Sequence, residues 1–151
     1  MPIAIKNSKI DISSEESTKE LAKDLSNYFK GGEVIFLYGE MGVGKTTFVK
    51  HLINQLQIEK KLPITEVTSP TFNLLNEYEL DDLIIKHYDL FRLKDESEIK
   101  NLDLFENNKT TIILIEWPQL ISKKNFKKTI DLVFSYENEL NNRSIKIDGL
   151  D

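Results

Sequence analysis

Runs of consecutive apolar residues mark the buried strands of this chain. Val34–Tyr38 follows a pair of glycines, and residues 111–115 form a second run of mostly aliphatic positions. Strands that are apolar on both faces are typical of sheets covered by helices on both sides. We therefore expect both strands near the centre of such a sheet.

Two other segments repeat apolar residues at helical spacing. The first carries them between residues 21 and 29, and the glycines at 31 and 32 end it. Its start is predicted at residues 13–16, where Ser13 and Glu16 have the spacing of a reciprocal cap. The second helix is predicted over residues 47–57, directly after a glycine-rich loop.

The remaining segments predict shorter elements. Pro70 marks a loop, because proline cannot continue a strand ladder or a helix. The expected elements are a strand over residues 1–5, strands over 73–80 and 83–88, a short helix over 95–101, and a C-terminal hairpin over 131–136 and 144–147. This order predicts an α/β fold: one domain over residues 1–151, with a central, mostly parallel but mixed sheet flanked by helices.

Composition narrows the classes of function. The 151 residues are 40% hydrophobic and 30% charged, as in a globular domain. The formal charge of −5 argues against a free-standing nucleic-acid binder, because neutralising phosphates requires a basic surface. Without cysteine, and with only His51 and His87, thiol catalysis and cages of Cys or His around a metal are excluded. The sequence suggests neither a signal peptide nor a membrane span, so we expect a cytoplasmic protein.

The strongest functional signal is the glycine-rich loop after the first buried strand. Residues 39–46 fit the P-loop pattern G-x-x-x-x-G-K-[ST], and the strand before it and the helix after it are the context that this motif requires. Backbone N–H groups of such a loop, with the helix N-terminus, hold the phosphates of a nucleotide. The predicted nucleotide-binding residues are Gly39, Glu40, Met41, Gly42, Val43, Gly44, Lys45, Thr46 and Thr47.

The end of the loop also predicts the bound ion. Lys45 is expected to reach the β- and γ-phosphates as a point charge, and the hydroxyl of Thr46 to bind Mg²⁺. ATP is favoured over GTP, because the guanine-selective pattern Asn-Lys-x-Asp is incomplete where residues 108–111 read Asn-Lys-Thr-Thr.

Two acidic residues follow apolar strands. Asp89 comes after the run at 83–88, and Glu116 after the run at 111–115. Because parallel strands gather their carboxyl ends at one edge, both acids are expected to converge on the phosphates, as Mg²⁺ ligands and as catalytic groups beside Lys45. A solvated strand end is the alternative for each, and the pattern leaves open which acid is the main Mg²⁺ ligand.

Two neighbours of these acids have a candidate role. His87 is two positions before Asp89 and shares its side of the strand, so it either orients a carboxylate or a water molecule, or fills the core. An internal arginine contact to phosphate is either made by Arg92 or absent. Arg143, the other arginine of the chain, is given no role.

Several segments together resemble the TsaE family (also called YjeE) of bacterial ATPases needed for threonylcarbamoyladenosine formation in tRNA. Beyond the P-loop, they are Ser-Pro-Thr-Phe at 69–72, His-Tyr-Asp-Leu-Phe-Arg at 87–92 and Glu-Trp-Pro at 116–118. The resemblance implies that Thr46 and Asp89 are associated with Mg²⁺. It also implies that Glu116 is important for nucleotide turnover, and that residues 69–72 form a loop that senses the γ-phosphate.

The resemblance further implies a function and partners. Such an ATPase hydrolyses ATP weakly alone and acts with TsaB and TsaD in the modification of adenosine 37 of tRNA, with indirect contact to the tRNA itself. Two alternatives use the same loop. One is a small-molecule or nucleotide kinase, which is disfavoured because kinase lids are rich in arginine and this chain has only two arginines. The other is a binding module that ATP gates without hydrolysis.

Overall fold

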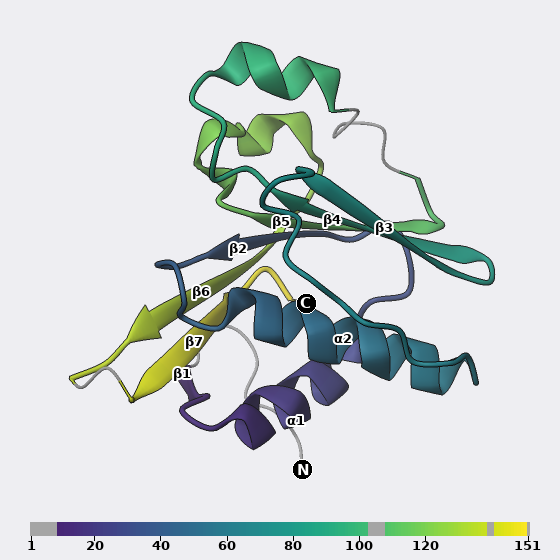
Figure 1. Cartoon of the computed structure of the whole chain (residues 1–151), viewed down its shortest axis with the longest axis vertical. Coiled ribbons are helices and arrows are strands. Elements are labelled where there is room, and N and C mark those ends of the chain that lie inside the picture. The colour runs from purple at the N-terminus through teal and green to yellow at the C-terminus, as the bar shows by residue number, and fades with distance from the viewer. Residues whose placement is uncertain (1–8, 103–107, 139–140, 151) are drawn as a thin grey trace.

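A seven-stranded mixed sheet runs through the protein in the computed structural model, which describes residues 9–102, 108–138 and 141–150 (Figure 1). Four parallel strands form its middle, and antiparallel strands extend it at both edges. In spatial order the strands are β1 (Lys9–Asp11), β7 (Arg143–Asp148), β6 (Ile130–Tyr136), β2 (Val34–Tyr38), β5 (Thr111–Glu116), β4 (Leu83–Asp89) and β3 (Leu75–Leu80). The predicted α/β fold with a mixed sheet is thus confirmed.

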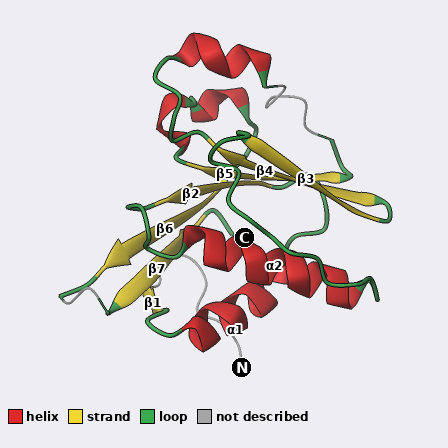
Figure 2. Ribbon diagram, viewed as in Figure 1, coloured by secondary structure: helices red, strands yellow, loops and turns green. Residues whose placement is uncertain are grey.

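The two faces of the sheet are covered differently (Figure 2). Helices α1 (Glu15–Ser26) and α2 (Lys45–Glu59) lie side by side on one face. The opposite face carries three short 3₁₀ helices, at Glu96–Asn101, Pro118–Leu120 and Lys123–Asn125. The prediction of helices on both sides is confirmed, although the α-helices of the described residues all lie on one side.

Strand β2 is buried on both faces of the sheet, and this burial explains its apolar sequence. Ile35 and Leu37 belong to the core on the side of the α-helices, whereas Val34 and Phe36 belong to the core on the other side. Because side chains alternate along a strand, a strand buried on both faces needs apolar residues at every position. Every residue of β5 is likewise buried, so the expected central place of both strands is confirmed.

The start of α1 differs from the prediction. Ser14 is the N-cap, and its Oγ accepts a hydrogen bond from the backbone N–H of Ser17 at 3.1 Å. The reciprocal cap expected between Ser13 and Glu16 is therefore wrong. Ser13 instead bonds back to the end of β1, where its N–H donates to Asp11 Oδ1 at 2.9 Å. The strand expected over residues 1–5 lies outside the described residues.

The sheet topology brings several strand ends to one edge. β2, β4, β5 and β6 are parallel, so their carboxyl ends meet there, and Asp89 is the cross-strand partner of Glu116. β7 is antiparallel to β6, so it begins at the same edge, where Arg143 pairs with Tyr136. No helix in the described part of the chain is both long and apolar enough to span a bilayer.

Candidate functional site

The loop between β2 and α2 has a backbone that only glycine adopts readily. Gly39, Gly42 and Gly44 have φ values of 148°, 81° and 116°. A Cβ on Gly39 would come within 2.9 Å of the carbonyl oxygen of Phe134 and of a methyl group of Val43. The loop can therefore close tightly against β6 only with glycine at its first position.

Helix α2 begins at this loop without a side-chain cap, because Gly44 is its N-cap. The first N–H groups of the helix thus have no side-chain acceptor from the cap position, and the positive end of the helix dipole faces the loop. Such a helix end attracts anions, phosphates above all.

A cavity of about 240 Å³ lies over the loop and the start of α2. Six of the residues predicted to bind nucleotide line it: Met41, Gly42, Gly44, Lys45, Thr46 and Thr47. Gly39, Glu40 and Val43 do not line it. Val43 is fully buried, and its N–H already donates to Glu40 O at 3.2 Å.

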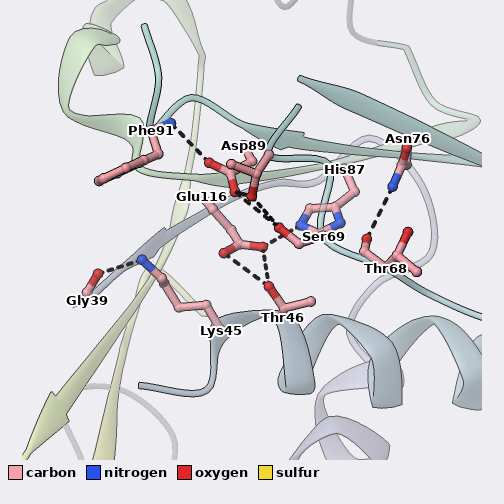
Figure 3. Close-up of polar contacts among 11 residues, drawn as sticks. Gly39, Lys45, Thr46, Thr68, Ser69, Asn76, His87, Asp89, Phe91 and Glu116 are labelled. Carbon is pink, nitrogen blue, oxygen red and sulfur yellow. Dashed lines mark hydrogen bonds and ion pairs between the residues drawn. The ribbon is translucent and has the colours of Figure 1, made fainter. Parts of the chain in front are cut away.

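Lys45 is buried at the bottom of this cavity, with only 4% of its surface exposed. Its Nζ donates a hydrogen bond to Gly39 O (Figure 3). The same atom lies 3.7 Å from the centre of the Trp117 ring. Burial lowers the pKa of Lys45, and the nearby carboxylates of Glu116 and Asp89 partly oppose that shift. A cation in this position is poorly solvated, so it would gain strongly from a phosphate placed next to it.

Glu116 connects the end of β5 to the helix start. One of its carboxylate oxygens accepts a hydrogen bond from Thr46 Oγ1 at 3.1 Å and lies 2.6 Å from His87 Nε2 (Figure 3). His87 is fully buried, and its Nδ1 is the only buried side-chain nitrogen or oxygen without a partner among the described residues. His87 is therefore a core residue that contacts a carboxylate through Nε2, but it is not a core histidine with both ring nitrogens satisfied.

Asp89 is held by the loop that contains Pro70. Its Oδ2 accepts hydrogen bonds from Ser69 Oγ at 3.3 Å and Thr71 Oγ1 at 3.0 Å, and its Oδ1 accepts one from the Phe91 N–H at 3.0 Å. The hydroxyl groups of Ser69 and Thr71 are thus bonded directly to one of the three predicted metal ligands.

The donors around the cavity fit Mg²⁺. Thr46, Asp89 and Glu116 all line it and offer a hydroxyl group and two carboxylates, the oxygen ligands that this ion prefers. In the described ranges, no three His, Cys, Asp or Glu side chains gather as a metal cage. A Mg²⁺ here would therefore also need oxygen atoms from phosphate or water, as is usual for this ion.

The two arginines are placed differently from expectation. Arg92 does not line the cavity; its Nη1 donates to the carbonyl oxygens of Phe72 at 3.3 Å and Thr71 at 3.5 Å. Arg143 does line it. Sequence reasoning missed Arg143, although the signal was present: a hairpin strand that follows a parallel strand must start at the same edge of the sheet.

Trp117 directly follows Glu116 in a strained conformation. Its φ and ψ are both 58°, in the left-handed region, which costs about 1–3 kcal/mol for a residue other than glycine. Its ring packs against Phe91 at 4.9 Å between centroids, with Lys45 over it. These contacts hold the side chain at the wall of the cavity.

Comparisons with known proteins agree with this geometry. A family model described as "Threonylcarbamoyl adenosine biosynthesis protein TsaE" matches residues 12–145. Proteins named tRNA threonylcarbamoyladenosine biosynthesis protein TsaE from Rickettsia conorii, Aquifex aeolicus and Bacillus subtilis are 42%, 40% and 36% identical over 73%, 74% and 78% of this chain. The matches cover 61%, 77% and 71% of those proteins, so the chain spans only about three fifths of the Rickettsia relative.

A solved structure supports the same relationship. The crystal structure of Bacillus subtilis YdiB superposes with a TM-score of 0.74 at 26% identity, over 99% of this chain and 90% of that one. The sequence resemblance stated above is thereby confirmed, because the family model matches most of the chain. The chain belongs to the TsaE family.

Proposed function

We propose that this protein is a Mg²⁺-dependent ATPase that supports threonylcarbamoyladenosine formation at adenosine 37 of tRNA. The observation that carries the proposal is the connection from the P-loop helix to a buried acid, in which Thr46 bonds to Glu116 and Glu116 to His87. The family and the names of the curated relatives support the role in tRNA modification.

The residues of the site divide the work by position. The N–H groups of the loop and the ammonium group of Lys45 bind the phosphates and stabilise the negative charge that is redistributed as the γ-phosphoryl group leaves. Thr46 and Asp89 would hold Mg²⁺, and the ion would offset phosphate charge when bound. The hydroxyl groups of Ser69 and Thr71 fix the Asp89 carboxylate in place.

Glu116 orients the attacking water in this proposal. Its carboxylate lines the cavity, and His87 holds it from the buried side, so one oxygen can still accept a hydrogen bond from a water molecule. We expect Glu116→Gln to bind Mg-ATP within about threefold of wild type while hydrolysis falls about 100-fold or more, as is typical for loss of a positioned acid–base group. Asp89→Asn should instead raise the Mg²⁺ concentration that hydrolysis requires.

Homologues of TsaB and TsaD are the expected partners. Steady-state ATP hydrolysis by the protein alone should be slow and should rise when both are added, and a pull-down with both should depend on Mg-ATP. Fast unassisted turnover would contradict the proposal. Full tRNA modification in cells that carry only Glu116→Ala would favour a module gated by ATP without hydrolysis, and transfer of phosphate to a small acceptor would favour a kinase.

A further inference from the structure

A cavity lies at the edge of the sheet opposite the P-loop. Strands β2, β5 and β6 are parallel, so all three begin at this edge and end at the other. The cavity has a volume of about 330 Å³, within the range of about 300–1,000 Å³ that is usual for binding sites. We call it the Tyr28 cavity. Its side-chain lining is Tyr28, Glu33, Val34, Lys128, Ile130 and Leu150.

Most of this side-chain lining is apolar. Val34, Ile130 and Leu150 are core residues that reach the cavity wall, and Tyr28 is half-buried beside them. The hydroxyl group of Tyr28 forms no hydrogen bond with any other described residue. The backbone turn at Gly31, with a φ of 128°, passes so close to residue 109 that a Cβ there would lie 2.0 Å from Lys109 O. The space is thus fixed by the main chain and suits one apolar or aromatic side chain.

The connections around the Tyr28 cavity are basic, although the whole chain carries a charge of −5. Residues 27–33, 108–110, 126–129 and 149–150 border this edge, and their charged side chains are four lysines and one glutamate. Lys30, Lys109 and Lys127 are exposed, and none of the three forms an ion pair within the described parts of the chain. The fourth lysine, Lys128, lines the cavity itself.

The one acid at this edge, Glu33, is held by its own turn. Its two carboxylate oxygens accept hydrogen bonds from the backbone N–H groups of Lys30 at 3.1 Å and Gly31 at 2.7 Å. These bonds offset part of its negative charge. An approaching anion therefore meets unpaired lysines around an apolar cavity, and such a local excess of one charge attracts partners of the opposite sign.

The chemistry of this edge favours a protein segment over a nucleic acid. Binding RNA requires an extended basic surface, and the negative charge of the whole chain opposes it. An acidic segment with one apolar or aromatic side chain matches both features, because interfaces commonly place such a side chain in a pocket within a polar rim.

We propose that the Tyr28 cavity is a docking site for an acidic segment of a partner protein. One apolar or aromatic side chain of that segment enters the cavity, and its carboxylates meet Lys30, Lys109 and Lys127. The proposal does not depend on ATP binding. Because the P-loop lies at the other edge of the sheet, both sites can be occupied at once.

Fluorescence anisotropy with two labelled pentapeptides tests the proposal. The probe is Glu-Glu-Phe-Glu-Glu, and its matched partner carries Ser in place of Phe. Wild-type protein should bind the Phe peptide saturably and about tenfold or more tightly than the Ser peptide, because only Phe fills the cavity. The Kd of the Phe peptide should rise as salt is increased from about 0.05 M to about 0.3 M.

A triple variant tests the lysines. Lys30→Gln/Lys109→Gln/Lys127→Gln should raise the Kd of the Phe peptide about tenfold, through the combined loss of three exposed charge contacts. The matched control is Lys19→Gln/Lys94→Gln/Lys146→Gln. It removes the same charge from exposed positions that do not line the cavity, and it should change the Kd less than about twofold.

Several results would overturn the docking site. They are no saturable binding of the Phe peptide, equal affinity for the two peptides, and equal weakening by the two triple variants. Tighter binding of a single-stranded RNA of about ten nucleotides than of the Phe peptide would overturn it in favour of a nucleic acid. Saturating Mg-ATP should leave the Kd of the peptide unchanged, so a failure of the proposed ATPase function would not affect this test. Displacement of the peptide by Mg-ATP would place it at the P-loop instead.

A second measurement locates the peptide without a protein variant. The photoreactive residue p-benzoylphenylalanine replaces Phe in the probe, and irradiation with wild-type protein should label peptides that contain residues 28–34 or 128–130. An excess of the unlabelled Phe peptide should prevent this labelling. Phe72 and Phe91 are exposed aromatic side chains elsewhere on the surface, and labelling confined to them would overturn the proposal.

Discussion

Replacing Glu116 tests how the buried histidine beside it is stabilised. In Glu116→Ala, Nε2 of His87 loses its partner at 2.6 Å, and Nδ1 has none among the described residues, so both ring nitrogens are left unsatisfied. Such a loss costs about 1–3 kcal/mol. Because Glu116 lines a cavity, water can enter the space that alanine leaves, so we expect the lower part of that range, about 1–2 kcal/mol.

Urea and thermal unfolding measure this change directly. For a protein of this size the melting temperature should fall by about 2–8 °C. Glu116→Gln keeps a polar partner for both His87 and Thr46, so it should cost less than about 1 kcal/mol. Glu79→Ala, an exposed acid on β3, is the control and should stay within about 0.5 kcal/mol of wild type. If Glu116→Ala is as stable as this control, the reasoning is refuted; if the glutamine variant is as unstable as the alanine variant, charge rather than hydrogen bonding is the cause.

Three further predictions concern the loop and the first helix. Gly39→Ala should lower the free energy of unfolding by about 2 kcal/mol or more in urea titrations, because its φ is 148° and its Cβ would meet Phe134 O. Lys45→Met should abolish binding of Mg-ATP yet be no less stable than wild type at neutral pH. Burial lowers the pKa of Lys45 in the folded protein below its ordinary value of 10.5. Between the folded-state pKa and 10.5, the unfolded chain therefore binds more protons at this residue than the folded protein does. The stability of wild type relative to Lys45→Met should accordingly increase as pH rises through the folded-state pKa toward 10.5, and a difference that is flat across pH would contradict the assignment. Ser14→Ala should cost about 1 kcal/mol through loss of the α1 cap, and Ser13→Ala should not reproduce a loss of α1 helicity by circular dichroism.

Local sequence patterns predict the position of an element correctly where one short-range cause dominates. The position of β2 agrees with its predicted range at both ends, because continuous apolar character bounded by glycine has few other solutions. The predicted cap of α1, Ser13, lies one residue before the observed cap, Ser14. Two adjacent serines can each cap, and the choice between them depends on Asp11, which bonds to Ser13 from the neighbouring strand. That contact is tertiary and has no signature in the helix itself.

The sequence by itself determined the glycine-rich loop, the two acids after apolar strands and the family. Each of these depends on residue types at fixed short spacing, which local backbone geometry translates directly into position. Only the tertiary structure decided that His87 contacts Glu116 and that Arg143, not Arg92, lies at the cavity. Both facts depend on which strands are neighbours and in which direction they run, and pairing between distant segments is set by the burial of the whole sheet rather than by any one of its strands.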